Sequence, residues 1–399
     1  MVRSLLTRLS LLLAVGLAAA HLGNEASAAP VDLLISSVSS NSILRYGSDG
    51  TFKGRFDNYT GPNNPLANPF GLAFSNDGSK LFVASLGNGS ILQYDANSGA
   101  YQRTIATSAM GISYPNDIAV GPDNNLYVAN YASNSILRYS TGSSPAFLGT
   151  FASGAATLGV TGLAFGTDPG NNNATVLYAV SSLNNTVTKL SATGVVESVI
   201  YSSGPSNPNP LNAPSDIAVN PNSGNVAISS FRSGSSTGPS SVGTRVTIQS
   251  PNPSSPSNGG MSSMASAQLR GPAGLAFDPN ASLANPVLLI ASYENNQIVR
   301  AVGASTLVPG VGLVESYTID PTPFISTSQA AQGGLNGPIY MTFFPPNTQG
   351  LPGGGGGTGG GGTGLSGTGA AVPEPASVAL TGLGVVLMVG YSQRRRKSA

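Results

Sequence analysis

The residues best suited to chemistry are a neighbouring amide and carboxylate, Asn116 and Asp117, at the start of a short apolar run. Asp216 opens a similar run farther along the chain. Carboxylate and amide oxygens are ligands that Ca²⁺ prefers, so these three are weak candidates for a metal site. The chain has no Cys, and its single His, His21, lies near the N-terminus. Thiolate ligands, Cys nucleophiles and His-based triads are therefore excluded from the rest of the chain.

A calcium site needs several oxygen ligands that converge on one point. The positions that correspond to Asn116 in related runs are Phe70, Thr161, Ser215, Ala273 and Ile339, which supply no further amide and no carboxylate. An Asp at the start of a strand more often accepts a hydrogen bond from a nearby turn amide. We therefore prefer a structural role for Asp117 and Asp216, and we expect no catalytic residue and no cofactor.

These runs belong to a sequence repeat, whose clearest copy spans residues 115–139. The apolar run 117–120 is followed by a Gly-Pro-Asp-Asn-Asn turn signal and by the runs 126–130 and 136–139. Short β-branched and aromatic runs between such turns predict antiparallel strands. The first runs of the six copies begin at Gly71, Asp117, Gly162, Asp216, Gly274 and Tyr340. Copies of three or four strands at this spacing are typical of a β-propeller.

The two ends of the repeat region complement each other. Residues 32–46 contain a second and a third run without a first, and residues 340–343 form a first run without the others. Joined, they complete one blade, which predicts an all-β, six-bladed β-propeller over residues 32–344 with one blade closed by both termini. Such closure hides sheet edges that would otherwise pair with other chains. A β-sandwich is the rival fold, but it does not explain the complementary ends.

Three tyrosines share one position in the third run of their copies: Tyr46, Tyr94 and Tyr139. An aromatic ring repeated at a strand position is explained by packing before it is explained by sugar stacking. We expect these rings to pack between blades.

Residues 1–29 are expected to be a signal peptide. Arg3 and Arg8 precede an apolar stretch, residues 9–20, and Ala26-Ser27-Ala28 is a small-residue cleavage site. The apolar stretch is shorter than the roughly 20 residues that a membrane span needs. The sequence therefore predicts export.

The C-terminus begins with a Gly-rich linker, residues 345–371, which has no capacity for a core. Residues 372–399 then hold, in order, a Pro-Glu-Pro motif, an apolar segment (residues 376–391) and a basic cluster; the motif and cluster residues are Val372, Pro373, Glu374, Pro375, Arg394, Arg395, Arg396 and Lys397. An apolar segment followed by cations predicts a transmembrane segment whose basic end stays cytoplasmic. At roughly 24 Å as a helix, it is short for a permanent anchor. We therefore expect transient membrane contact.

The propeller copies resemble NHL repeats, in the strings GLAF or DIAV, then LYVAN, then NSILRY. The resemblance covers residues 32–344 and implies an NHL-like propeller whose first strands lie nearest the central axis. The C-terminal parts resemble the PEP-CTERM sorting signal of Gram-negative and cyanobacterial exopolysaccharide producers. That resemblance implies an exosortase as the processing partner, which cuts near Pro-Glu-Pro and releases or attaches the protein outside the cell.

Together these features predict a non-enzymatic propeller at the cell surface or in the extracellular matrix, which binds a protein or a polysaccharide through one face. The near-balanced net charge of +1 gives no support for nucleic acid as a partner. The alternative rests on Pro115-Asn116-Asp117, which resembles a phrase in gluconolactonase-type propellers and implies a calcium-dependent lactonase or hydrolase. Lyases on related propellers use histidine, which the body of this chain lacks.

Overall fold

The computed structural model describes residues 31–59, 64–168, 171–202, 211–231, 245–250, 262–308 and 312–345. The chain divides into two compact units, Met1–Pro30 and Val31–Ala399, and every described residue belongs to the second. The predicted signal peptide, the linker after Pro345 and the predicted sorting signal lie outside the described residues. None of the helices in the described ranges is both long enough and apolar enough to cross a membrane.

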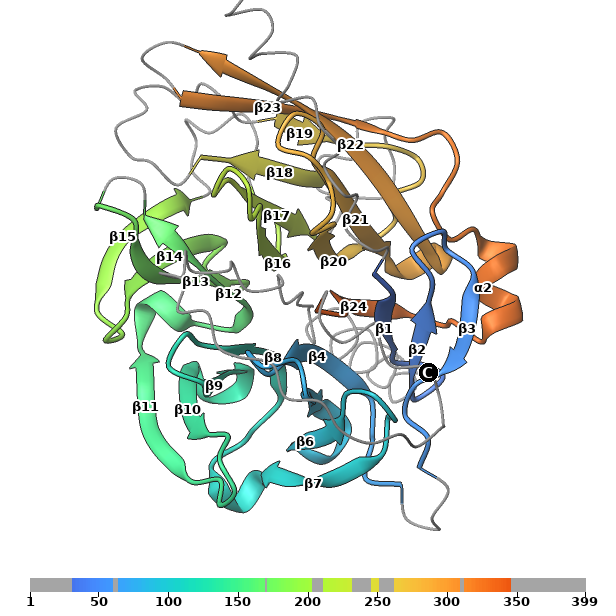
Figure 1. Cartoon of the computed structure of the whole chain (residues 1–399). Coiled ribbons are helices and arrows are strands. Elements are labelled where there is room, and N and C mark those ends of the chain that lie inside the picture. The colour runs from blue at the N-terminus through green and yellow to red at the C-terminus, as the bar shows by residue number, and fades with distance from the viewer. Residues whose placement is uncertain are drawn as a thin grey trace, which may run out of the picture. The chain divides into compact units, whose positions relative to one another are not determined.

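The described strands form six antiparallel sheets of four strands each, which we name blades A to F (Figure 1). Blade A consists of β24 (Pro338–Phe343), β1 (Leu33–Ser37), β2 (Ser42–Tyr46) and β3 (Phe52–Arg55). Blade B consists of β4 (Pro69–Phe74), β5 (Lys80–Ser85), β6 (Ser90–Asp95) and β7 (Tyr101–Ala106). Blade C consists of β8 (Pro115–Val120), β9 (Asn125–Asn130), β10 (Ser135–Ser140) and β11 (Phe147–Ser153).

The second half of the propeller repeats this order. Blade D consists of β12 (Val160–Asp168), β13 (Ala174–Ser181), β14 (Thr186–Ser191) and β15 (Val196–Ser202). Blade E consists of β16 (Pro214–Val219), β17 (Val226–Ser230), β18 (Arg245–Gln249) and β19 (Ser262–Met264). Blade F consists of β20 (Pro272–Phe277), β21 (Val287–Ser292), β22 (Gln297–Val308) and β23 (Gly312–Ile319).

Short helices lie in the connections. The turns between second and third strands contain the 3₁₀ helices η1 (Leu86–Asn88), η3 (Tyr131–Ser133) and η5 (Tyr293–Asn295). The loops that lead to the next blade contain η2 (Ser108–Met110), η4 (Ala155–Thr157) and the α-helix α2 (Thr327–Gly333). Helix α2 begins with a capping box, because the Ser326 hydroxyl accepts the Gln329 N–H while the Gln329 side chain accepts the Ser326 N–H.

The ring closes through blade A. Strand β24, from the C-terminal end of the propeller, pairs antiparallel with β1, with Leu33 opposite Phe343 and Ile35 opposite Met341. The innermost strands of neighbouring blades contact one another around the whole ring, in the order β4, β8, β12, β16, β20, β24 and back to β4. The prediction of a six-bladed propeller with one blade made from both ends is therefore confirmed.

The inner strands share the core with the second and third strands of their blades. Every residue of β4, β8, β16, β20 and β24 is buried, whereas the outer strands β3 and β15 are largely exposed. An inner strand has a neighbouring blade on each of its two faces. Side chains on both faces of an inner strand are therefore buried, the polar Asn116 and Asp117 of β8 included.

The third-strand tyrosines are fully buried, and each pairs with an aromatic ring of its own blade, while their packing between blades stays a prediction. Tyr46 lies opposite Phe52 on the fourth strand of its own blade, with ring centroids 5.4 Å apart. The equivalent pairs are Tyr94 with Tyr101 at 5.8 Å and Tyr139 with Phe147 at 5.2 Å. The rings thus pair within a blade, since directly opposed residues of adjacent strands are the closest neighbours in a sheet.

Candidate functional site

One face of the propeller gathers the longer connections. The chain direction alternates along each blade, so the turns between second and third strands share a face with the loops that lead into the next blade. We name this the junction face. The remaining turns, between first and second and between third and fourth strands, form the opposite face.

Each blade holds its own incoming loop with the last residue of its second strand. The Ser85 hydroxyl accepts the Ala67 N–H at 2.8 Å, and Asn130 Oδ1 accepts the Ser113 N–H at 2.6 Å. Ser37, Ser230 and Ser292 accept a loop N–H in the same way, whereas the Ser181 hydroxyl donates to the Leu158 carbonyl of its loop. Backbone groups that leave the sheet ladder are thereby satisfied by side chains.

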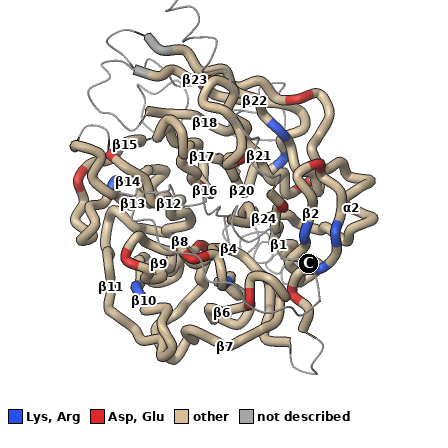
Figure 2. Tube along the Cα trace, viewed as in Figure 1, with Lys and Arg blue, Asp and Glu red and all other residues tan. Residues whose placement is uncertain are grey.

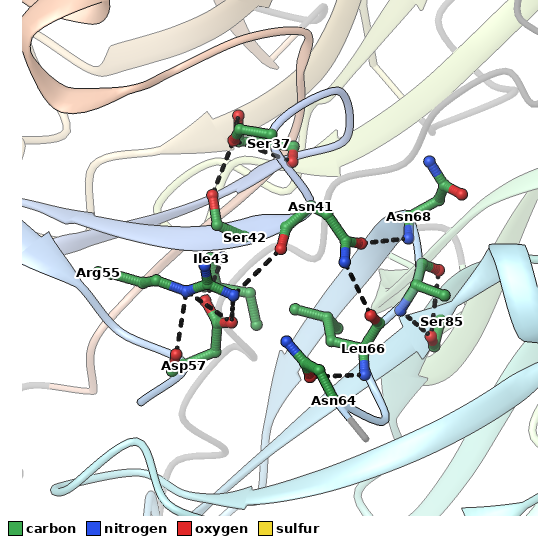
Figure 3. A network of polar contacts seen from close by, with 12 residues as sticks. Ser37, Asn41, Ser42, Ile43, Arg55, Asp57, Asn64, Leu66, Asn68 and Ser85 are labelled. Atoms are coloured by element: carbon green, nitrogen blue, oxygen red, sulfur yellow. Dashed lines mark hydrogen bonds and ion pairs between the residues drawn. The ribbon is translucent and has the colours of Figure 1, made fainter. Parts of the chain in front are cut away.

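A second polar contact joins a blade to the next at four junctions in the described part of the chain, as Figure 3 shows for blades A and B. Asn41 has a φ of 52°, and its side chain accepts the Asn68 N–H at 2.7 Å and donates to the Leu66 carbonyl at 2.9 Å. The same left-handed conformation and the same bridge recur at three asparagines, where Asn134, Asn185 and Asn296 accept from Gly159, Ala213 and Gly337. Asn tolerates a positive φ better than most residues. The same residue can therefore form the turn with its backbone and the bridge with its side chain.

An ion pair supports the bridge between blades A and B (Figure 3). Arg55 donates to the Asn41 carbonyl at 3.2 Å and from Nε to Asp57 Oδ2 at 2.9 Å. Asp57 Oδ1 accepts the Ile43 N–H at 2.6 Å. Asp57 is 1% exposed, and burial raises the pKa of its carboxyl more than Arg55 and Ile43 lower it.

The junction between blades B and C departs from this pattern. Gly89 occupies the bridging position, with a φ of 62° and no side chain to reach the next blade. The residue before β8 is Tyr114, which has a φ of 52° and is 47% exposed. Its carbonyl accepts the Tyr131 N–H at 3.2 Å, whereas its own N–H has no hydrogen-bond partner among the described residues.

A positive φ is unusual for a tyrosine. The residue that precedes the inner strand has a positive φ in all six blades, and the other five are Asn68, Gly159, Ala213, Gly271 and Gly337. A bulky residue in this conformation costs roughly 1–2 kcal/mol, and such strain gathers at functional positions. Sequence reasoning missed Tyr114 because it lies outside the apolar runs. The signal that could have found it is its alignment with Gly, Asn and Ala in the other copies.

The candidate metal ligands lie on inner strands. Asn116 and Asp117 are on β8 and Asp216 is on β16, and all three are fully buried. Asp117 Oδ2 accepts the Leu163 N–H of blade D, and Asp216 Oδ2 accepts the Leu275 N–H of blade F, both at 2.8 Å. Each carboxylate thus joins its blade to the next one, and blade D separates the two.

Burial raises the pKa of Asp117 well above its ordinary value, against the opposing hydrogen bonds from the Leu163 and Ile118 N–H groups. Within the described ranges, no group of three or more His, Cys, Asp and Glu side chains is placed to hold a metal ion. The acidic side chains there do not by themselves form a calcium site. Metal binding by Asn116, Asp117 and Asp216 stays a prediction. The sorting residues 372–375 and 394–397 lie outside the described residues and stay a prediction too.

No model of a known protein family matches this chain, and no curated protein does. Solved structures do match. The periplasmic gluconolactonase of Pseudomonas aeruginosa has 13% identity and a TM-score of 0.47, over 79% of this chain and 99% of that one. A catalytically inactive virginiamycin B lyase from Staphylococcus aureus, solved with quinupristin, has 17% identity and a TM-score of 0.41, over 67% and 79%. The nidogen/laminin complex has 15% identity and a TM-score of 0.47, over 72% and 98%. At these identities the likeness concerns the fold alone.

These comparisons correct the prediction that the protein is not an enzyme. A gluconolactonase and a lyase are enzymes, and both are similar in fold to this chain. The prediction rested on the absence of His and Cys from the body of the chain. That absence removes thiol and imidazole mechanisms, but it leaves carboxylate chemistry open.

Proposed function

We propose that this protein is an exported propeller that binds a neutral polysaccharide through its junction face, at the cell surface or in the extracellular matrix. The observation that carries the ligand class is the chemistry of the junction face. The turns at residues 38–41, 86–89, 131–134, 182–185 and 293–296 are rich in Asn, Ser and Tyr. Glu294 is the single charged residue in these five turns.

Two pairs of opposite charges that reach the junction face are ion pairs, whereas Arg270, in the loop that leads into blade F, is exposed and forms no salt bridge with a described residue. In the blade-to-blade loops Asp57 pairs with Arg55, and Asp320 pairs with Arg300. By contrast, turns on the opposite face carry the carboxylates Asp49, Asp77, Asp95 and Asp123. Figure 2 shows charged residues as short isolated segments along a chain that is mostly uncharged.

Amide, hydroxyl and phenol groups match the hydroxyls of a neutral sugar. They donate and accept hydrogen bonds without the cost of desolvating a charge. A strongly charged ligand would find few opposite charges on this face to complement its own. Neutral polysaccharide is therefore the ligand that the junction face fits best.

The location is proposed from the two ends of the sequence. The signal-peptide pattern of residues 1–29 supports export. The order of Pro-Glu-Pro motif, short apolar segment and basic cluster in residues 372–399 supports processing by an exosortase. Mass spectrometry of the exported protein should find no residues after about Glu374 when the host exosortase is intact, and should find them when it is deleted. Retention in both strains would contradict the sorting proposal.

Binding is tested with soluble neutral and acidic polysaccharides in isothermal titration calorimetry. We expect saturable binding to at least one neutral glucan and weaker binding to acidic polymers of the same length. Binding confined to acidic polymers, or no binding, would contradict the proposal. Lactone hydrolysis should be measured with and without Ca²⁺ in parallel, because calcium-dependent turnover would assign the alternative lactonase.

A further inference from the structure

The junction between blades B and C is built unlike the four junctions at which an Asn bridge is described. At the junction of blades F and A, the aromatic ring comes from the turn of the preceding blade. A Cβ added at Gly337 would lie 2.9 Å from the Tyr293 ring and 3.0 Å from the Ser39 hydroxyl. At the junction of blades E and F, a Cβ at Gly271 would lie 3.0 Å from the Phe231 ring. These glycines are therefore covered by aromatic side chains of the blade before.

At the junction of blades B and C this arrangement is reversed. The preceding turn supplies Leu86 at the position of Phe231 and Tyr293, and the loop residue itself supplies the ring, that of Tyr114. Phe231 is 5% exposed, whereas Tyr114 is 47% exposed. The ring at this junction thus faces solvent instead of covering its neighbour's backbone.

The backbone N–H of Tyr114 also lacks the side-chain acceptor that the equivalent residue has at other junctions. At four junctions an Asn side chain accepts the N–H of the residue before the inner strand. Gly89 makes no such bridge, and no described residue accepts the Tyr114 N–H. The half-exposed side chain and the N–H without a described acceptor both belong to Tyr114. This residue lies on the junction face, whose turns carry hydroxyl and amide side chains.

We propose that Tyr114 forms a subsite for one neutral sugar ring, with Gly89 leaving the Tyr114 N–H without a described side-chain acceptor. The phenol ring packs against the apolar C–H face of the sugar, and the N–H donates to a ring hydroxyl. This inference rests on the proposed polysaccharide function and locates it. It also gives a reason for a left-handed Tyr where the other blades have Gly, Asn or Ala.

Two substitutions separate the ring from the amide. Tyr114→Asn removes the ring and keeps a residue that accepts a positive φ, as Asn68 does at the same position of blade B. Gly89→Asn restores the missing bridge, because a Cβ there would contact nothing closer than 3.7 Å and its φ of 62° suits Asn. Phe147→Ala is the matched control, because Phe147 is also 47% exposed but lies on the outer strand β11.

The probes are maltohexaose and cellohexaose, titrated into the full-length protein, with thermal unfolding as the check on folding. We expect Tyr114→Asn to weaken binding by about three- to tenfold, the effect of one lost stacking contact. Gly89→Asn should raise the melting temperature and still weaken binding, which a merely destabilising variant would not do. Phe147→Ala should bind like wild type.

The outcomes separate this subsite from the function on which it rests. Wild-type binding that survives both Tyr114→Asn and Gly89→Asn overturns the subsite and leaves polysaccharide binding in place. Equal weakening by Phe147→Ala also overturns the subsite, because it shows a general loss of packing. Absence of wild-type binding to these and to longer neutral glucans overturns the proposed function itself.

Discussion

Replacement of Asn41 by Gly tests the bridge between blades quantitatively. Gly takes a φ of 52° without strain, so the change removes the side chain and leaves the turn. The side chain makes two hydrogen bonds, with the Asn68 N–H and the Leu66 carbonyl. At about 0.5–1.5 kcal/mol each, their loss should lower the free energy of unfolding by about 1–3 kcal/mol. The added freedom of Gly in the unfolded chain costs about 0.4–1 kcal/mol more.

Asn134→Gly is the internal comparison. This side chain makes one bridge to the next blade, to the Gly159 N–H at 2.7 Å, so its loss should cost about 0.5–1.5 kcal/mol. The glycine contribution to the unfolded state is the same in both variants and cancels in the difference. Urea unfolding followed by circular dichroism and tyrosine fluorescence measures both values, since the chain has no Trp. Equal losses in the two variants, or no loss for Asn41→Gly, would refute the hydrogen-bond accounting.

Three further changes test other contacts. The raised pKa of Asp117 means that its contribution to stability is present below about pH 4 and is lost as the pH rises through the folded-state pKa. The free energy of unfolding of wild type should therefore fall relative to Asp117→Asn between pH 4 and pH 8, and a constant difference would contradict this. Gly71→Ala places a Cβ 2.8 Å from the Asp117 backbone and should cost about 1–3 kcal/mol, whereas Gly142→Ala meets no atom within 4 Å and should cost little. Lys189→Met strips the buried Asp168 of its cation and should cost about 3–5 kcal/mol, most of it recovered by a second change, Asp168→Leu.

The arrangement of strands into blades was predictable because it depends on short stretches of neighbouring residues. Each strand is a short apolar run bounded by turn residues, and the incomplete first and last copies indicated that both ends share blade A. The contacts between blades could not be predicted in the same way. Asn41 and Asn134 stand in the repeated string NSILRY, but the amides that they bridge lie in the next copy.

The candidate site shows the same limit. We expected Asp117 to accept a hydrogen bond from a nearby backbone amide, and it accepts one from the adjacent Ile118 N–H and another from Leu163 on the inner strand of the next blade. Tyr114 drew no attention in the sequence, because nothing in its immediate neighbours indicates a left-handed backbone for a tyrosine. The Asp117–Leu163 contact and the left-handed backbone of Tyr114 can be recognised only when equivalent positions of neighbouring blades are compared in the folded ring.

The central claim, that a neutral polysaccharide binds to the junction face, is tested most directly by hydrogen–deuterium exchange with and without the bound glucan. We expect slower exchange in peptides that contain residues 86–90, 108–114 and 131–134, which belong to the junction face at blades B and C. Exchange in residues 75–79 and 121–125, on the opposite face of the same blades, should not change. Protection confined to the opposite face, or protection nowhere in the propeller at saturating glucan, would contradict the account.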